Sequence, residues 1–238
     1  MGTPQSANLR VLLKLSGGFF AGEGGNGFGF EGIKERAKWV IDAAEGRELA
    51  LVIGGGNLLR GFEASSFGVD RPTADGAGML ATVMNALVFQ SLLESLGRDT
   101  RVMTAIDMQQ IAEPFIRRRA IRHLEKGRIV ILAGGTGNPY FTTDSAAALR
   151  AAELNCSSLI KATSVKGVYT ADPKKNPESR LLERVSPRDF LMNDYRVMDA
   201  SAVSLCRENG IPILVFKLDG PDTLKRAMAG ENVGTVIA

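Results

Sequence analysis

Two lysines stand where expected strands end, which is where a parallel sheet meets its ligand. Lys14 lies near the end of the apolar run Leu9–Leu15, and Lys161 directly follows the expected strand 157–160. Because an unpaired buried ammonium group is costly, each lysine should face a polar cleft or an acidic partner. Each could instead be a strand-end lysine that reaches solvent, but two lysines at equivalent positions favour phosphate binding.

Glycines follow two other apolar runs. The triplet 54–56 comes after the run 49–53, and the pair 134–135 comes after the run 129–133. Consecutive glycines let backbone N–H groups converge on an anion, although a simple tight turn would also use them. Arg60, one turn beyond the triplet, would add a forked phosphate contact. Glycine is 27 of 238 residues, about 11% against a usual ~7%, which indicates close approach of the backbone to a ligand.

The segment 134–144, GGTGNPYFTTD, is the most specific feature of the sequence. It begins after a buried strand and ends where a helix is expected. Thr142 or Thr143 would cap that helix, and Asp144 would favour its positive end. Capping alone explains these three residues, but it does not explain the glycines and threonine that precede them.

An uncharged stretch of eighteen residues, 76–93, reaches the length of a membrane span. Polar residues interrupt it, so we expect a helix that is buried against the core and against another subunit of a homo-oligomer. Asp75, just ahead of it, is either the helix N-cap or an acceptor for a ribose hydroxyl. The start 1–8 lacks an apolar targeting segment, and we expect a cytoplasmic protein.

Several chemistries are excluded by the composition. A Walker P-loop does not occur, and the formal Gly-x-Gly-x-x-Gly at 22–27 does not lead directly into a helix. Two cysteines, Cys156 and Cys206, cannot build a disulfide scaffold or a thiolate zinc site. His123 is the one histidine and lies in the basic run 117–122, so a multi-histidine metal site is excluded. The net charge of +3 does not require a nucleic-acid partner.

The elements that must position these residues alternate between strand and helix. Apolar strands followed by helices imply an α/β fold with a mostly parallel sheet covered on both faces. Ligands bind such sheets at the carboxyl ends of the strands, where the lysines and glycines stand. We expect strands at 9–15, 49–53, 101–104, 129–133, 157–160 and 213–216, and an edge strand at 233–237. We expect helices around 33–44, 57, 76–93, 114–126, 143–152, 200–208 and 221–229, and a mobile flap at 171–184.

The sequence resembles the bacterial-type uridylate (UMP) kinases of the amino-acid-kinase superfamily from about residue 10 to residue 237. The resemblance rests on LLKLSG at 12–17, VIGGGNLLRG at 52–61, GMLATVMNAL at 78–87, GTGNPYFTTDSAA at 135–147, KATSVKGVYTADP at 161–173 and VMDASA at 197–202.

The resemblance implies the reaction ATP + UMP → ADP + UDP with Mg²⁺ that arrives with ATP, in pyrimidine nucleotide synthesis. It implies the amino-acid-kinase fold, a three-layer α/β/α sandwich. It also implies a homohexamer built from dimers, activation by GTP and inhibition by UTP. We expect a flexible N-terminus at 1–8 and a single domain at 9–238, whose N-terminal half binds mainly UMP and whose C-terminal half binds mainly ATP.

The resemblance also assigns site residues by motif position. We expect Lys14 and Lys161 to stabilise the transferring phosphoryl group, Asp144 to orient them, and Asp199 to be a supporting acid. The residues expected to bind ATP are Lys14, Leu15, Ser16, Gly17, Gly56, Arg60, Thr163, Tyr169 and Asp172. The residues expected to bind UMP are Gly55, Arg60, Asp75, Thr136, Gly137, Asn138, Pro139, Tyr140, Phe141, Thr142 and Thr143.

The chain departs from the family pattern at Gly18 and Lys166, where the family usually has acids, and in its long glycine-rich loop 21–30, where the family binds GTP. Two other functions stay open. One is a relative in the same superfamily that phosphorylates a carboxylate or carbamate, and the other is a nucleotide-sensing regulator that binds nucleic acid through the basic run 117–128.

Overall fold

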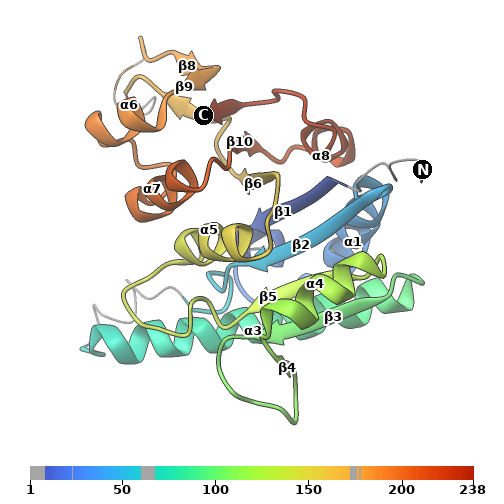
Figure 1. The fold of residues 1–238 in the computed structure, drawn as a ribbon. Helices are drawn as coiled ribbons and strands as arrows, with labels where there is room; N and C mark the ends of the chain where they lie inside the picture. Colours follow the sequence, from blue (N-terminus) through green and yellow to red (C-terminus); the bar gives the residue numbers. More distant parts are fainter. Residues whose placement is uncertain (1–8, 23, 60–67, 172–175, 177) are drawn as a thin grey trace.

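A nine-stranded sheet forms the middle layer of the protein (Figure 1). The computed structural model describes residues 9–22, 24–59, 68–171, 176 and 178–238. The strands lie in the order β4-β3-β5-β2-β1-β6-β10-β11-β9. All neighbouring pairs are parallel except β10 and β11. The strands are β1 Leu9–Leu15, β2 Arg47–Ile53, β3 Thr100–Thr104, β4 Glu113–Pro114, β5 Ile129–Ala133, β6 Ser158–Thr163, β9 Arg184–Val185, β10 Ile213–Lys217 and β11 Thr235–Ile237.

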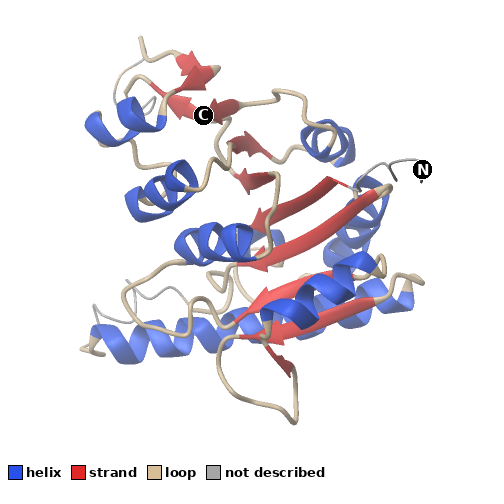
Figure 2. Ribbon diagram, viewed as in Figure 1, coloured by secondary structure: helices blue, strands red, loops and turns tan. Residues whose placement is uncertain are grey.

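Helices cover both faces of this sheet (Figure 2). One apolar core lies between the sheet and α1, α3 and α8, and a second lies between the sheet and α4, α5, α6 and α7. The expected three-layer α/β/α sandwich with a mostly parallel sheet is therefore confirmed. The helices are α1 Phe30–Ala43, α3 Arg71–Ser95, α4 Arg117–Glu125, α5 Thr143–Glu153, α6 Pro187–Met192, α7 Ala200–Glu208 and α8 Pro221–Met228, with a short 3₁₀ turn η1 at Gly17–Phe19.

Strand register places the two lysines side by side. β1 and β6 are parallel neighbours, and Lys14 and Lys161 are paired residues across them. Side chains alternate along a strand, so paired residues project from the same face. The neighbouring apolar residues Leu12 and Val215 on that face belong to the core under α5 and α7, so both lysines point toward the same helical layer.

The helix α3 is longer than expected and begins earlier. Asp70 caps it by accepting a hydrogen bond from the Thr73 N–H at 3.1 Å, so Asp75 lies inside the helix and is not its N-cap. The expectation placed the start at the uncharged stretch, whereas the Asp-x-x-Thr cap lies one turn upstream. By length and composition α3 could cross a membrane, but its side chains Phe89 and Leu93 are buried against the sheet core.

Four other boundaries differ from the expectation. Pro114 lies in the edge strand β4, and α4 begins at Arg117; an edge position suits proline because it lacks an N–H. Lys161 lies within β6 and not after it. The strand β11 is flanked by β9, so it is not the edge of the sheet. Within the described residues 54–59 no helix begins, because the chain makes turns there.

The region 171–184, expected to be a flap, contains a short strand in its described part. This strand, Leu181–Leu182 (β8), pairs antiparallel with Val168–Tyr169 (β7), which lies just ahead of the region, in a separate two-stranded sheet. The expected flexible start 1–8 lies outside the described residues.

Candidate active site

Asp144 joins the two lysines into one buried ionic cluster. Its Oδ1 lies 2.9 Å from Lys14 Nζ, and its Oδ2 accepts a hydrogen bond from Lys161 Nζ. The contact between Lys14 Nζ and Asp144 Oδ1 is an ion pair, but its geometry is not that of a hydrogen bond. All three residues are less than 9% exposed, so charges that would repel each other are held together by a shared carboxylate.

The amino end of α5 carries Asp144 to the lysines. Thr142 is the N-cap of this helix and accepts a hydrogen bond from the Asp144 N–H at 3.0 Å. Lys161 Nζ also donates to the carbonyl oxygen of Val197 at 2.6 Å. The positive end of the helix dipole and two ammonium groups therefore converge on one point, which is an arrangement suited to a polyanion.

Burial and charge set the pKa values of this cluster. Burial alone would raise the pKa of Asp144, but the charges of Lys14 and Lys161 outweigh it and hold that pKa below its ordinary value. Burial lowers the pKa of Lys161, and the Lys14 charge adds to this effect, while Asp144 opposes it. Lys161 therefore loses its proton at a lower pH than an exposed lysine does.

The lowered pKa of Lys161 predicts how kcat depends on pH at the alkaline end. If turnover needs the charged form of Lys161, kcat should fall as pH rises, with an apparent pKa below the ordinary lysine value of about 10.4. Lys161→Arg keeps its charge in this range, so its residual activity should lose that limb or show it at higher pH. A pH profile of kcat for both proteins is the measurement, and the same alkaline limb in Lys161→Arg would contradict the assignment.

The glycine triplet 54–56 packs between the first loop and α3. A Cβ on Gly17 would lie 2.5 Å from the backbone N of Gly56, and a Cβ on Gly55 would lie 2.8 Å from the Cβ of Ala81. Such contacts are too close for a side chain, so both positions require glycine. Backbone groups of two loops are thereby brought together at the carboxyl ends of β1 and β2.

A reciprocal amide pair fixes this glycine triplet. The buried side chains of Asn57 and Asn85 exchange hydrogen bonds at 3.1 and 2.7 Å. Asn85 also donates to the Gly54 carbonyl at 2.7 Å, and Asn57 donates to the Gly27 carbonyl at 2.9 Å. The pair connects α3, the glycine triplet and the glycine-rich loop, so all three are held at defined positions.

On one side of the cluster is a cavity of about 260 Å³, which we call the Asp75 cavity. Asp75 Oδ2 accepts hydrogen bonds from Arg71 Nε at 2.8 Å and from the Tyr140 N–H at 2.7 Å. The wall next to the cluster comes from the residues that lead into α5. The lining residues are Gly55, Gly56, Leu59, Arg71, Ala74, Asp75, Gly78, Met79, Thr82, Gly135, Phe141, Thr142 and Thr143.

A second, more apolar cavity of about 440 Å³, which we call the Tyr169 cavity, also borders the cluster. It is lined by 165–171, apart from Lys166, and by 193–197. Its wall includes Val197, whose carbonyl binds Lys161. Neighbours of the ionic cluster therefore line both cavities: Thr143, next to Asp144, lines the first, and Val197 lines the second.

The structure divides the residues expected to bind ATP among several places. Tyr169 lines the Tyr169 cavity, whereas Gly56 lines the Asp75 cavity. Leu15, Ser16 and Thr163 line a third cavity of about 390 Å³ next to Trp39 of α1. Lys14 is in the ionic cluster, and Gly17 is buried against the glycine triplet. Arg60 and Asp172 lie outside the described residues.

The residues expected to bind UMP are only partly gathered. Five of them line the Asp75 cavity: Gly55, Asp75, Phe141, Thr142 and Thr143. Thr136 and Asn138 line a neighbouring groove between α5 and α7. Gly137 and Pro139 line none of these cavities, and Tyr140 contributes its backbone N–H to Asp75.

Asp199 supports the site from the other half of the chain. Its carboxylate accepts hydrogen bonds from Thr142 Oγ1 and, at 3.4 Å, from Ser145 Oγ. It is also the N-cap residue of α7. Asp199 therefore connects the amino ends of α5 and α7, and its role as a supporting acid stays a prediction.

Several site residues were missed by the sequence analysis. Arg71, Thr82 and the Asn57–Asn85 pair all contact parts of the site. Thr82 Oγ1 accepts a hydrogen bond from the Gly134 N–H at 2.9 Å. One sequence feature could have revealed two of them: Thr82 and Asn85 are polar residues in an uncharged helix, and their spacing of three places them on one side of it.

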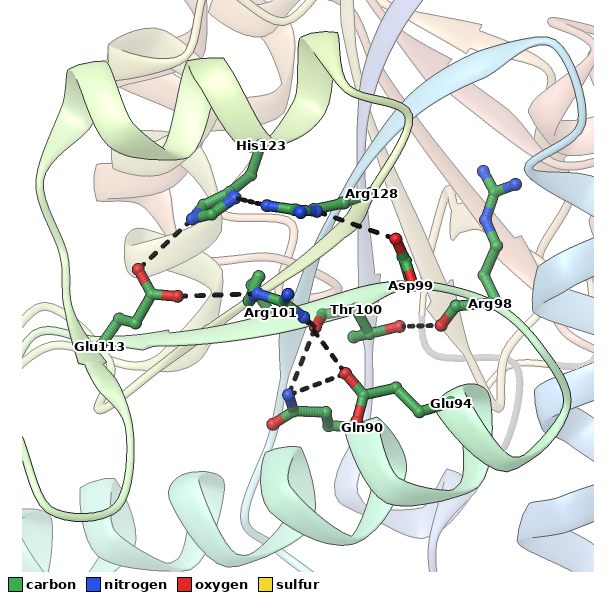
Figure 3. A network of polar contacts seen from close by, with 9 residues as sticks. All are labelled: Gln90, Glu94, Arg98, Asp99, Thr100, Arg101, Glu113, His123 and Arg128. Atoms are coloured by element: carbon green, nitrogen blue, oxygen red, sulfur yellow. Dashed lines mark hydrogen bonds and ion pairs between the residues drawn. The ribbon is translucent and has the colours of Figure 1, made fainter.

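His123 lies in a separate polar network (Figure 3). Its Nε2 lies 3.3 Å from Glu113 Oε2, and its Nδ1 lies 2.9 Å from Arg128 Nη1. Arg128 and Asp99 directly precede β5 and β3, so this network is at the amino ends of strands, opposite the ionic cluster. Ion pairs to Glu113 and Glu125 engage two arginines of α4, Arg119 and Arg122.

The described residues contain no group of three or more metal-binding side chains. The carboxylate of Asp144 is already bound to two lysines.

Comparisons with known proteins identify the family of this chain. The model of the amino acid kinase family matches residues 9–217, so the chain belongs to the amino acid kinase family. A uridylate kinase of Erythrobacter litoralis (strain HTCC2594) is 56% identical over 229 residues, which are 96% of both chains. The expected resemblance to bacterial-type UMP kinases and the expectation of a nucleoside monophosphate kinase are confirmed.

Solved structures show the same fold. The UMP kinase of Bacillus anthracis superposes with a TM-score of 0.92 at 40% identity, covering 96% of this chain and 95% of that one. The UMP kinase of Ureaplasma parvum gives 0.91 at 34% identity, covering 97% and 99%. A uridylate kinase of Archaeoglobus fulgidus gives 0.75 at 31% identity, covering 96% and 99%.

Proposed function

We propose that this protein transfers the γ-phosphoryl group of ATP to UMP, giving ADP and UDP. The observation that carries the proposal is the Lys14–Asp144–Lys161 cluster, whose neighbours Thr143 and Val197 line two different cavities. UMP occupies the Asp75 cavity and ATP the Tyr169 cavity, with their phosphates meeting at the lysines. The similarity to uridylate kinases supports this choice of substrates.

Charge stabilisation and alignment accomplish the transfer. The phosphate oxygen of UMP is already ionised near neutral pH, so it attacks the γ-phosphorus without a general base. Lys14 and Lys161 stabilise the charge on the transferring group, and Asp144 keeps both ammonium groups aimed at it. Thr142 and Thr143, at the amino end of α5, face the UMP phosphate. Mg²⁺ that arrives with ATP would supply further neutralisation of phosphate charge, while Lys14 and Lys161 are the fixed donors of the protein.

A coupled assay of ADP release tests the proposal directly. With ATP and Mg²⁺ present, UMP should support turnover, while CMP and acetylglutamate should support little or none. Turnover with acetylglutamate and not with UMP would show that the chain is instead a carboxylate kinase of the same family.

In this proposal the two halves of the chain bind different nucleotides. The part up to α5 builds the Asp75 cavity and binds mainly UMP, and the later part builds the Tyr169 cavity and binds mainly ATP. A single sheet runs through both halves, which supports one domain at 9–238.

We further propose a homohexamer built from dimers, with α3 at a subunit interface. The outward side of α3 exposes Leu80 and Met84 by half of their surface, 50% and 52%. These residues are four apart and form an apolar stripe on an exposed helix face. A second copy of the chain would cover this stripe.

A charged side chain on this stripe should break the assembly. Leu80→Asp is expected to lower the mass found by sedimentation velocity, because an unpaired carboxylate cannot be buried in an apolar interface. Met192→Asp is the matched control, since Met192 is exposed on α6, away from α3. A Leu80→Asp protein that sediments like the wild type would contradict the proposed interface.

Regulation and cellular role follow the same resemblance. We propose activation by GTP, inhibition by UTP, a role in pyrimidine nucleotide synthesis and a cytoplasmic location. This chain departs from the family pattern at Gly18, at Lys166 and in the loop 21–30, and the family binds GTP at this loop. A UMP titration with and without GTP and UTP tests the effector proposals, and unchanged kinetics would contradict them.

A further inference from the structure

Two donors hold Asp75 by the same carboxylate oxygen. Arg71 Nε lies 2.8 Å from Oδ2, and the Tyr140 N–H donates to Oδ2 at 2.7 Å. Among the described residues, Oδ1 accepts no hydrogen bond. The two donors therefore fix the carboxylate, and no donor from the described residues occupies its other oxygen in the Asp75 cavity, which Arg71 and Asp75 both line.

A hydrogen bond from the Tyr140 N–H to Asp75 joins the 134–143 loop to α3, and Arg71 contacts both of these residues. Its guanidinium carbon lies 5.7 Å from the centroid of the Tyr140 ring. Tyr140 has φ +72°, which residues other than glycine rarely adopt. Such a backbone conformation persists only where the surroundings enforce it. The Arg71 guanidinium and the Asp75 carboxylate supply those surroundings in the described structure.

We propose that Arg71 is a positioning residue that sets the affinity for the acceptor nucleotide through Asp75, an inference that rests on the proposed function. The ribose hydroxyls of UMP can donate to Oδ1, which only accepts. The planar guanidinium fixes the direction of the carboxylate, which a flexible point charge does less well. Arg71 therefore acts on sugar binding and not on the transfer step at Lys14 and Lys161.

Steady-state kinetics with two acceptors test this role. Arg71→Ala should raise the KM for UMP about tenfold and change kcat by less than about threefold. The reason is that the Asp75 carboxylate loses the charge-assisted hydrogen bond from Arg71 that holds it toward the ribose. With 2′,3′-dideoxy-UMP, which has no sugar hydroxyl to donate, the same substitution should raise KM by less than about twofold. Arg71→Lys should restore part of the affinity for UMP.

A matched arginine separates this effect from general destabilisation. Arg226 lies on α8 with its Nε 2.7 Å from Glu231, and its side chain is 58% exposed, against 54% for Arg71. Arg226→Ala should leave the KM for UMP unchanged.

Two results would overturn the inference: an Arg71→Ala enzyme that matches Arg226→Ala, or equal KM penalties for UMP and the dideoxy acceptor. Wild-type protein that forms no UDP from UMP would instead refute the proposed function.

Discussion

Lys14→Met is expected to lower kcat for UDP formation by at least about 100-fold, while the protein remains folded. Removing one preorganised donor from a transition state typically costs about 2.7–4 kcal/mol of barrier. Lys14 is 8% exposed and bound to Asp144, so no bulk water can replace its charge. Methionine fills a similar volume without the charge, and kcat from the coupled assay is the measurement.

Lys217→Met is the matched control for this substitution. Lys217 also stands at the end of a central strand, β10, but it pairs with Asp219 at 2.6 Å and its side chain is 42% exposed. Its substitution should leave turnover near the wild-type value. Near-normal turnover of Lys14→Met would refute the role assigned to Lys14, whereas equal losses in both variants would indicate a structural effect.

Asp144→Asn should impair both stability and turnover. The substitution leaves Lys14 and Lys161 facing each other without a neutralising charge. Removing one partner of a buried ion pair typically costs about 3–5 kcal/mol in the free energy of unfolding. Turnover should also fall by about 100-fold, because small displacements of aligned groups are this costly. Denaturant unfolding and steady-state kinetics measure the two effects.

Asp222→Asn isolates the contribution of a helix terminus. Asp222 lies in the first turn of α8, as Asp144 does in α5, but it is exposed. Its loss should cost less than about 1 kcal/mol, the scale of a helix-dipole contact. If Asp144→Asn costs no more than Asp222→Asn, the carboxylate does not hold the lysines together.

The sheet and the positions of the lysines were predictable from local patterns. Apolar runs such as 49–53 and 129–133 have the composition of strands buried on both faces. The rule that parallel strands gather ligands at their carboxyl ends predicts that Lys14 and Lys161 lie close together. The cap at Thr142 was also predictable, since threonine ahead of an alanine-rich run is a local feature.

Contacts between distant segments were not predictable in this way. Nothing near Val197 indicates that its backbone carbonyl binds Lys161, because any residue supplies a carbonyl. The uncharged stretch 76–93 predicts a helix that starts after Asp75, whereas Asp70 provides the cap of α3. Pro114 resembles a helix start as much as an edge strand, and only pairing with β3 distinguishes them.

The most direct test of the account is a crystal structure with UMP and a non-hydrolysable ATP analogue bound together. The predicted result places uridine in the Asp75 cavity, adenine in the Tyr169 cavity and the facing phosphates about 3 Å from the Nζ atoms of Lys14 and Lys161. Nucleotides bound with their phosphates away from these lysines, or both on one side of Asp144, would contradict it.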